Sequence, residues 1–171
     1  MAESWIRPFV FPAPVAPPAV AILMSIDDDV ALLAGVPTFQ VLGYDALRVL
    51  AIGSEHRELA RGDVLFRAGE AADAGFVVQH GGFRLTSEGA PSEEVLAGPG
   101  ALIGELALIV PMQRPATATA VEYSVVVRIG RTLFQRVLES DPEAARRLRD
   151  DLAARTSDSV STISLAGAKM L

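Results

Sequence analysis

The sequence contains no cysteine and only two histidines, His56 and His80, among 171 residues. Without cysteine the chain has no disulfide, no thiolate zinc site and no cysteine nucleophile. It also has no His-x-His pair for a cupin-type metal centre and no Gly-x-Ser-x-Gly motif of a serine hydrolase. We therefore expect no catalytic residue, no metal and no cofactor. The lack of cysteine suits a reducing compartment, so we expect a cytoplasmic protein.

Basic residues are scarce, and long apolar runs are missing. Fifteen Lys and Arg stand against 21 Asp and Glu, which gives a formal net charge of −6. Phosphate backbones require a clustered basic face, so we expect no nucleic-acid partner. The sequence has no stretch of about 20 apolar residues, so we expect no membrane span. Hydrophobic residues make up 50% of the chain, which is enough for one packed domain.

Proline sets the first 24 residues apart, because five of the 11 prolines lie there. Proline fixes φ and lacks a backbone N–H, so this spacing predicts an irregular arm rather than a helix. The prolines also interrupt the apolar run that a signal peptide would need. Trp5, Phe9 and Phe11 could dock on a partner, although a loose arm is the simpler interpretation.

Helical signals flank the middle of the chain. Asp27–Asp29 can cap a short helix, and Asp45 falls in the first turn of a second helix that Gly53 can end. Near the other end, Asp141 followed by Pro142 is a strong helix start, with a capping carboxylate and proline at the first position.

Between these helices the pattern changes to short apolar or alternating runs separated by glycine. The runs are Val64–Phe66, Phe76–Val78, Phe83–Thr86, Val95–Leu96 and Tyr123–Ile129. Many short strands with glycine turns predict a sandwich or barrel of antiparallel strands. The expected fold class is therefore mainly β with flanking α-helices.

One apolar segment combines a glycine, a helical turn and a lone arginine. Gly104 permits a close backbone approach, and Leu106–Ile109 can form a helical turn whose unpaired N–H groups suit an anion. Arg114 is the only basic residue between Arg84 and Arg128. A buried guanidinium needs an anionic partner, and it can hold a phosphate through two parallel hydrogen bonds.

Glu105 lies in the same apolar run, where its carboxylate needs hydrogen-bond donors. Sugar hydroxyls, backbone amides or Arg114 could supply them. The spacing alone therefore leaves two interpretations open. Arg114 either binds an incoming phosphate or forms an internal ion pair with Glu105.

This segment resembles the phosphate-binding cassette of the cyclic nucleotide-binding domain family. That family includes the catabolite activator protein and the regulatory subunits of cyclic-AMP-dependent protein kinase. The resemblance rests on the sequence GELAL at residues 104–108, Arg114, Ala116 and Thr117, framed by Gly62, Gly69, Gly81, Gly98 and Gly100. It covers roughly residues 30–155.

The resemblance implies an eight-stranded antiparallel β-roll (a jelly roll) with N-terminal helices and a C-terminal lid helix. The expected divisions are a proline-rich arm at 1–24, a cyclic nucleotide-binding domain at 25–158 and a flexible tail at 159–171. A helix-turn-helix does not fit into the 16 residues after Arg155, so we expect a stand-alone domain without a DNA-binding module.

The resemblance also implies a ligand site. Arg114 would hold the exocyclic oxygens of the cyclic phosphate, and Glu105 would accept a hydrogen bond from the ribose 2′-hydroxyl. The expected ligand-binding residues are Gly104, Glu105, Leu106, Ala107, Arg114, Pro115, Ala116 and Thr117, with amides around Leu106 and Ala107 as further donors. Leu148 and Leu152, spaced along one helix face, are the expected lid contacts.

Pro115 departs from the family pattern, in which Ala, Ser or Thr often follows the arginine. Proline lacks the N–H that many members direct at the phosphate, and the loss of such a hydrogen bond costs about 1.5–3 kcal/mol. Proline also lacks the hydroxyl that often accompanies a preference for cyclic GMP. Cyclic AMP is therefore the expected ligand, and cyclic GMP is the alternative.

We thus expect a non-catalytic sensor that binds cyclic AMP and moves its C-terminal helix to signal to an effector protein. The sequence names no effector, and it is compatible with a monomer or a homo-oligomer. The competing hypothesis is a degenerate member of the fold that binds no ligand. Such a protein would act as a protein-interaction module, with Glu105 paired to Arg114.

Overall fold

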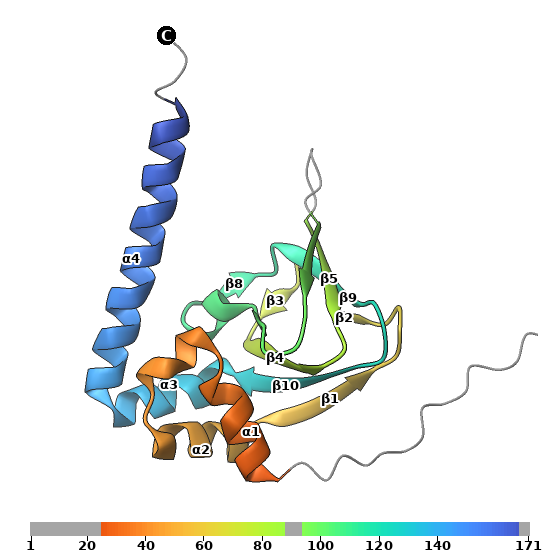
Figure 1. The fold of residues 1–171 in the computed structure, drawn as a ribbon, viewed down its shortest axis with the longest axis horizontal. Helices are drawn as coiled ribbons and strands as arrows, with labels where there is room; N and C mark the ends of the chain where they lie inside the picture. Colours follow the sequence, from red (N-terminus) through yellow and green to blue (C-terminus); the bar gives the residue numbers. More distant parts are fainter. Residues whose placement is uncertain (1–24, 88–93, 168–171) are drawn as a thin grey trace, which may run out of the picture.

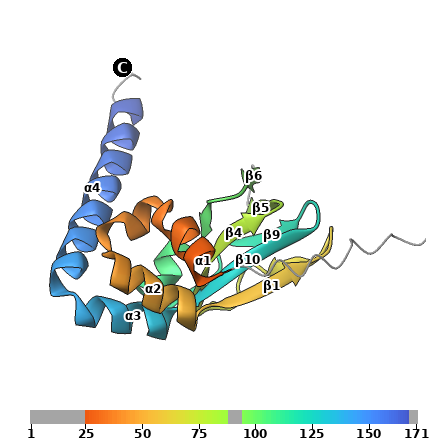
Figure 2. The same ribbon diagram turned by 60° about the horizontal axis from the view of Figure 1, so that its bottom comes forward.

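The computed structural model describes the backbone of residues 25–87 and 94–167 and the side chains of 25–87 and 94–154. Within these ranges the chain folds into a roll of antiparallel strands with four α-helices gathered at one end (Figures 1 and 2). The mainly β architecture with flanking helices is therefore as expected. The proline-rich arm at 1–24 lies outside the described residues, and the domain boundaries stay predictions.

The helices before the roll are α1 (Ile26–Ala34), the 3₁₀ helix η1 (Pro37–Val41) and α2 (Tyr44–Gly53). The cap of α1 is Ser25 rather than one of the aspartates that follow it. The Ser25 hydroxyl accepts from the Asp28 amide at 3.2 Å, and the Asp28 carboxylate accepts from the Ser25 amide at 3.0 Å. This reciprocal pair satisfies two N–H groups at the helix start. In α2, Asp45 lies in the first turn and Gly53 is the last residue, as the sequence predicts.

The strands form two four-stranded sheets and one two-stranded ribbon, and all pairs are antiparallel. The first sheet has the order β1 (Glu55–Leu59), β10 (Ser124–Gly130), β4 (Ala74–His80) and β7 (Leu102–Ile103). The second has the order β2 (Val64–Phe66), β9 (Ala116–Ala120), β5 (Phe83–Ser87) and β6 (Glu94–Ala97), and the ribbon joins β3 (Ala71–Ala72) to β8 (Met112–Gln113). The ten strands of the described residues thus exceed the expected eight by the β3–β8 pair.

Side chains on the first sheet alternate between two hydrophobic cores, because neighbouring residues of a strand point to opposite faces. On β4, Phe76 and Val78 point into the roll, whereas Val77 faces the helices. On β10, Val126 faces the roll and Val127 faces the helices. The first sheet therefore separates the interior of the roll from the core beneath the helices.

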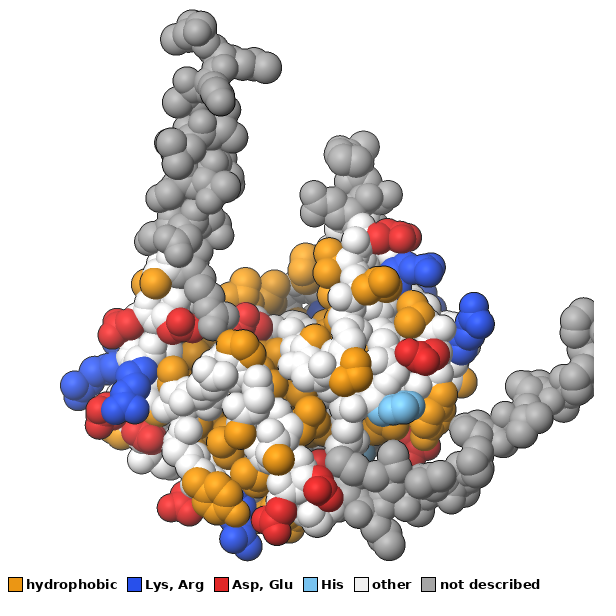
Figure 3. All heavy atoms as spheres, viewed as in Figure 1, with side chains coloured by type: hydrophobic (Ala, Val, Ile, Leu, Met, Phe, Trp, Pro, Cys, Tyr) orange, Lys and Arg blue, Asp and Glu red, His pale blue; other side chains and the backbone are white. Residues whose placement is uncertain are grey.

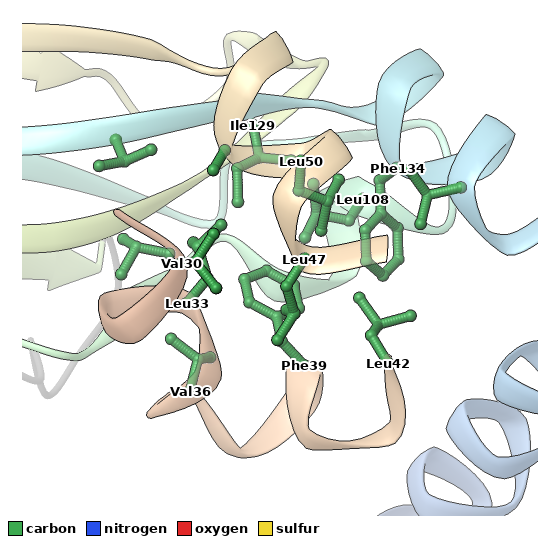
Figure 4. Close-up of a cluster of buried hydrophobic side chains, with 14 of the residues drawn as sticks. Val30, Leu33, Val36, Phe39, Leu42, Leu47, Leu50, Leu108, Ile129 and Phe134 are labelled. Atoms are coloured by element: carbon green, nitrogen blue, oxygen red, sulfur yellow. The ribbon is translucent and has the colours of Figure 1, made fainter. Parts of the chain in front are cut away.

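The core beneath the helices collects side chains from every helix and from the first sheet, and most of them are drawn in Figure 4. Phe39 of η1 and Phe134 of α3 (Arg131–Ser140) are fully buried, with ring centroids 5.7 Å apart. Leu33 and Leu50 are buried in the same cluster. Because so much apolar surface meets here, this cluster holds the N-terminal helices against the roll.

The last helix, α4 (Pro142–Gly167), starts where the sequence predicts and leads away from the roll (Figure 1). The Asp141 carboxylate accepts from the Ala144 amide at 3.0 Å, which caps the helix next to its initial proline. The helix includes residues 159–167, the first part of the expected tail. No helix within the described ranges combines the length and hydropathy that a membrane span requires.

Replacement of Phe39 by alanine tests the core beneath the helices. We expect Phe39→Ala to lower the free energy of unfolding by about 3–5 kcal/mol, because it removes a buried ring and leaves a cavity. The matched control is Ile52→Ala on α2, where the side chain is 61% exposed and the expected change is below about 0.5 kcal/mol. Denaturant unfolding followed by circular dichroism measures both, and equal losses would contradict the placement of Phe39.

Candidate functional site

The candidate site begins at Gly104, where β7 turns into a short 3₁₀ helix, η2 (Glu105–Leu108). Gly104 has φ +79°, and a Cβ at this position would overlap Nη1 of Arg114. Only glycine avoids both the left-handed strain and the overlap. The helical turn expected after Gly104 is thus present, and it begins at Glu105. Its Ala107 amide donates to the Gly104 carbonyl at 3.1 Å and is already used.

Arg114 is buried at the centre of the site, with 5% of its surface exposed. Its Nη2 donates to the Ala74 carbonyl at 2.7 Å, whereas Nη1 is buried and has no hydrogen-bond partner among the residues that the structure describes. The guanidinium carbon lies 4.2 Å from the ring centroid of Phe66 and 5.3 Å from that of Phe76. Two aromatic faces and one carbonyl therefore hold the cation and leave one donor nitrogen unused.

The backbone of Arg114 is held as firmly as its side chain. The Arg114 amide donates to the Glu70 carbonyl at 2.8 Å, and the Gly69 amide donates to the Arg114 carbonyl at 2.8 Å. The turn before β3 thereby fixes the start point of the arginine side chain. An arginine anchored at both ends loses little further freedom when it binds a ligand.

Burial lowers the pKa of Arg114, because removal from water disfavours the charged form. The carboxylates of Asp73 and Glu70 raise this pKa in part, and the charge of Arg128 lowers it further. No ion pair among the described residues includes Arg114. A buried cation with these properties would gain stability from an anion that reaches its unused nitrogen.

Glu105 is half-buried at the start of η2, and its Oε1 accepts a hydrogen bond from the Thr38 hydroxyl of η1. The internal pair with Arg114, which the sequence left open, does not occur among the ion pairs of the described residues. The carboxylate and the guanidinium therefore keep separate contacts while both border the same space.

That space is a cavity of about 290 Å³ inside the roll. Every expected ligand-binding residue except Thr117 lines it: Gly104, Glu105, Leu106, Ala107, Arg114, Pro115 and Ala116. Thr117 instead accepts a hydrogen bond from the Ala68 amide at 3.0 Å. Hydrophobic side chains gather between the base of α4 and β5 in Figure 3.

Sequence reasoning missed the apolar walls of the cavity. They come from Phe66, Ala72, Leu85, Leu102, Ile103 and Met112, on five different strands. Alternation along a strand can tell which side chains point inward, but the partner of each side chain depends on how the strands pair.

A second hollow, about 670 Å³, lies between α2 and α3 and includes no cassette residue.

The expected lid residues do not join the site. Leu148 is 2% exposed and packs with Phe39 and Phe134 in the core beneath the helices, and Leu152 packs against the same cluster. Neither side chain lines the cavity. Their helical spacing identifies an apolar face correctly, but that face covers the other helices rather than the roll opening.

The cassette is attached to α3 through its carbonyl groups. Arg131 Nη1 donates to the cassette carbonyls of Ala107 and Val110 at 3.3 and 3.2 Å. It also donates to the Ala72 carbonyl of β3 at 2.9 Å. The Leu108 side chain of η2 is fully buried in the core beneath the helices. A Cβ on Gly75 of β4 would lie 3.1 Å from Leu108, so this glycine lets η2 sit close to the sheet. The cassette thus contacts the cavity on one side and the helices on the other.

Comparison with known proteins identifies the family to which this fold belongs. The sequence profile of the family described as "Cyclic nucleotide-binding domain" matches residues 56–141. A cyclic nucleotide-binding-like protein from Brucella abortus shares 38% identity with a TM-score of 0.59, covering 66% of this chain and 99% of that one. The chain therefore belongs to the cyclic nucleotide-binding domain family, as its sequence indicates.

Relatives in this family place the domain in different kinds of protein. A cyclic nucleotide-gated potassium channel from Mesorhizobium japonicum is 35% identical over 118 residues, which are 69% of this chain but 32% of the channel. The regulatory domain of PKA from Toxoplasma gondii, crystallised with cAMP, is 25% identical with a TM-score of 0.64, covering 78% of this chain and 50% of that one. The chain thus corresponds to about a third of the channel's length.

Replacement of Gly104 tests the local geometry of the site. We expect Gly104→Ala to lower the free energy of unfolding by at least about 1–2 kcal/mol, because alanine is strained at this φ and its methyl group displaces Arg114. The control is Gly98→Ala, where a Cβ would meet no atom within 4 Å. Thermal unfolding compares the variants, and a Gly104→Ala variant as stable as Gly98→Ala would contradict the described turn.

Proposed function

We propose that this domain is a non-catalytic sensor that binds a cyclic nucleotide in the cavity of the roll, with cyclic AMP as the expected ligand. The observation that carries the proposal is the unused Nη1 of Arg114, buried at a cavity that also contains a carboxylate. An anionic diester can accept hydrogen bonds from the guanidinium, and a hydroxyl beside it can donate one to the carboxylate. A cyclic ribonucleotide carries both groups on one rigid ring.

The proposed contacts involve residues that line the cavity. Arg114 Nη1 donates to an exocyclic phosphate oxygen while Nη2 keeps its bond to Ala74. Glu105 accepts from the ribose 2′-hydroxyl. The amide of Leu106, in the first turn of η2, is a further donor candidate. Pro115 has no N–H to contribute, so the arginine supplies a larger share of the phosphate binding than in a protein with an amide there.

Two observations favour cyclic AMP over cyclic GMP. The Toxoplasma gondii relative was crystallised with cAMP, which supports this ligand. Pro115 lacks the hydroxyl that the family resemblance associates with cyclic GMP. The walls beyond the cassette are apolar side chains such as Phe66, Leu85 and Met112, which suit the face of either purine. Cyclic GMP therefore stays the alternative ligand.

We further propose that ligand binding shifts η2 and thereby α3 and α4, which present the signal to an effector protein. Two described contacts support this route, the bonds from Arg131 to the cassette carbonyls and the burial of Leu108 among the helices. A ligand can shift the helices only by its differential affinity for two arrangements. In this proposal α4 acts as a lid by moving as a whole when the ligand binds.

Replacement of Arg114 tests the binding proposal directly. We expect Arg114→Ala to weaken cyclic AMP binding by about 2–5 kcal/mol, because the desolvated phosphate loses its charged partner. The matched control is Arg84→Ala on β5, an exposed arginine 3.9 Å from Glu94, which should leave the affinity unchanged. Isothermal titration calorimetry measures all three proteins, and equal affinities in parent and Arg114→Ala would disprove the assigned role.

The same titration separates the sensor from the ligand-free interaction module. If the parent protein gives no heat and no shift in melting temperature with millimolar cyclic AMP or cyclic GMP, the sensor proposal fails. The degenerate-fold hypothesis would then take its place. Repeating the titration without residues 1–24 shows whether the proline-rich arm affects binding.

Replacement of Arg131 tests the route to α4. Because the chain has no cysteine, Arg57→Cys on β1 and Arg149→Cys on α4 give two specific spin-label sites on exposed positions. We expect cyclic AMP to change the distance between these labels. Arg131→Ala should reduce that change by at least about half, while the affinity for cyclic AMP stays within about threefold of the parent value. Electron paramagnetic resonance measures the distance.

The control for this experiment is Arg136→Ala, an exposed arginine further along α3. The ligand-dependent change should survive there. A change of full size in the Arg131→Ala protein would show that the carbonyl contacts do not transmit the movement.

A further inference from the structure

Thr38 contacts the candidate site from outside the roll. It belongs to η1, is 3% exposed, and its hydroxyl donates to Oε1 of Glu105. No family motif in the sequence includes this residue, and it does not line the cavity. Thr38 nevertheless contacts the carboxylate that is proposed to accept a hydrogen bond from the ribose 2′-hydroxyl.

The chemistry of the two groups allows this bond to persist when a ligand is present. A hydroxyl has one hydrogen to donate, whereas a carboxylate has two oxygens with about four acceptor positions. The Thr38 bond occupies one of these positions on Oε1. A carboxylate thus has more acceptor positions than this bond uses, so the Thr38 contact can fix Glu105 without competing with a ligand hydroxyl.

The donor itself stands on a rigid support. Backbone hydrogen bonds fix η1 around Thr38. The Phe39 amide donates to the Val36 carbonyl at 2.9 Å, and the Leu42 amide donates to the Phe39 carbonyl at 3.0 Å. Val36 and Phe39 are both buried in the core beneath the helices. A hydroxyl held in this way limits the rotamers that Glu105 can adopt.

We propose that Thr38 is a positioning residue that orients the Glu105 carboxylate toward the ribose 2′-hydroxyl and so selects cyclic ribonucleotides over their 2′-deoxy analogues. This inference rests on the proposed function. It adds a selectivity element that lies in the N-terminal helices rather than in the cassette. The residue acts through Glu105 and does not touch the ligand.

The test compares two ligands on each protein. Isothermal titration calorimetry gives the ratio of the dissociation constants for 2′-deoxy-cyclic AMP and cyclic AMP. In the parent we expect a ratio of about ten or more, as for a hydrogen bond to a charged group. Thr38→Val keeps the shape but removes the donor, and the ratio should fall below about three. Thr38→Ser restores the donor and should restore the ratio.

A matched control separates positioning from a general loss of stability. Ser124 is fully buried, and its hydroxyl accepts from the Gly82 amide at 3.0 Å in the turn between β4 and β5. Ser124→Ala should lower the melting temperature and leave the ligand ratio unchanged. If Thr38→Val does not fold, Thr38→Ala replaces it in the same comparison with Thr38→Ser.

The outcomes distinguish the two proposals. A parent that binds neither nucleotide overturns the sensor function and this inference together. A parent that binds both, but with a ratio near one, overturns only the inference and the ribose role of Glu105. An unchanged ratio in the Thr38→Val protein shows that Thr38 does not orient Glu105. A rise in cyclic AMP affinity in that protein shows competition, which also overturns the inference.

Discussion

A buried positive charge that forms no ion pair within the described part of the chain is the constraint on which the rest of the site depends. The Arg114 guanidinium lies against two phenylalanine rings and donates to one carbonyl, while its Nη1 has no hydrogen-bond partner in residues 25–87 and 94–154. Such a group is costly to bury, and the roll tolerates it because β2, β4 and the turn before β3 fix it from several sides. The cavity, the glycine at its edge and Glu105 all lie around this one side chain.

The cassette connects two cores that the first sheet otherwise separates. Its Arg114 end borders the interior of the roll, and its Leu108 side chain belongs to the core beneath the helices. Arg131 donates hydrogen bonds to the cassette carbonyls of Ala107 and Val110. A shift of the cassette therefore cannot stay inside the roll, because packed cores adopt discrete arrangements rather than deforming continuously. This geometry supports the proposed coupling of ligand binding to the position of α4.

The sequence predicted much of the fold because its signals are local. Glycine-separated runs became strands, Asp141 and Pro142 began α4, and the order of Gly104, Glu105 and Arg114 identified the cassette. What escaped prediction depends on contacts between distant segments. Phe66 and Arg114 meet only because β2 pairs with β9, and Thr38 reaches Glu105 only after η1 folds onto the sheet. Leu148 shows the same limit, since helical spacing marks an apolar face without telling what the face covers.

Gly75 has a consequence for how such domains can diverge. Its missing side chain sets the thickness of the layer between β4 and η2, where Leu108 would be 3.1 Å from an added Cβ. A larger residue there would press on the Leu108 side chain and so on the cassette, while every residue that lines the cavity stayed the same. The volume of one strand residue outside the pocket is thus a means of adjusting pocket depth independently of pocket chemistry.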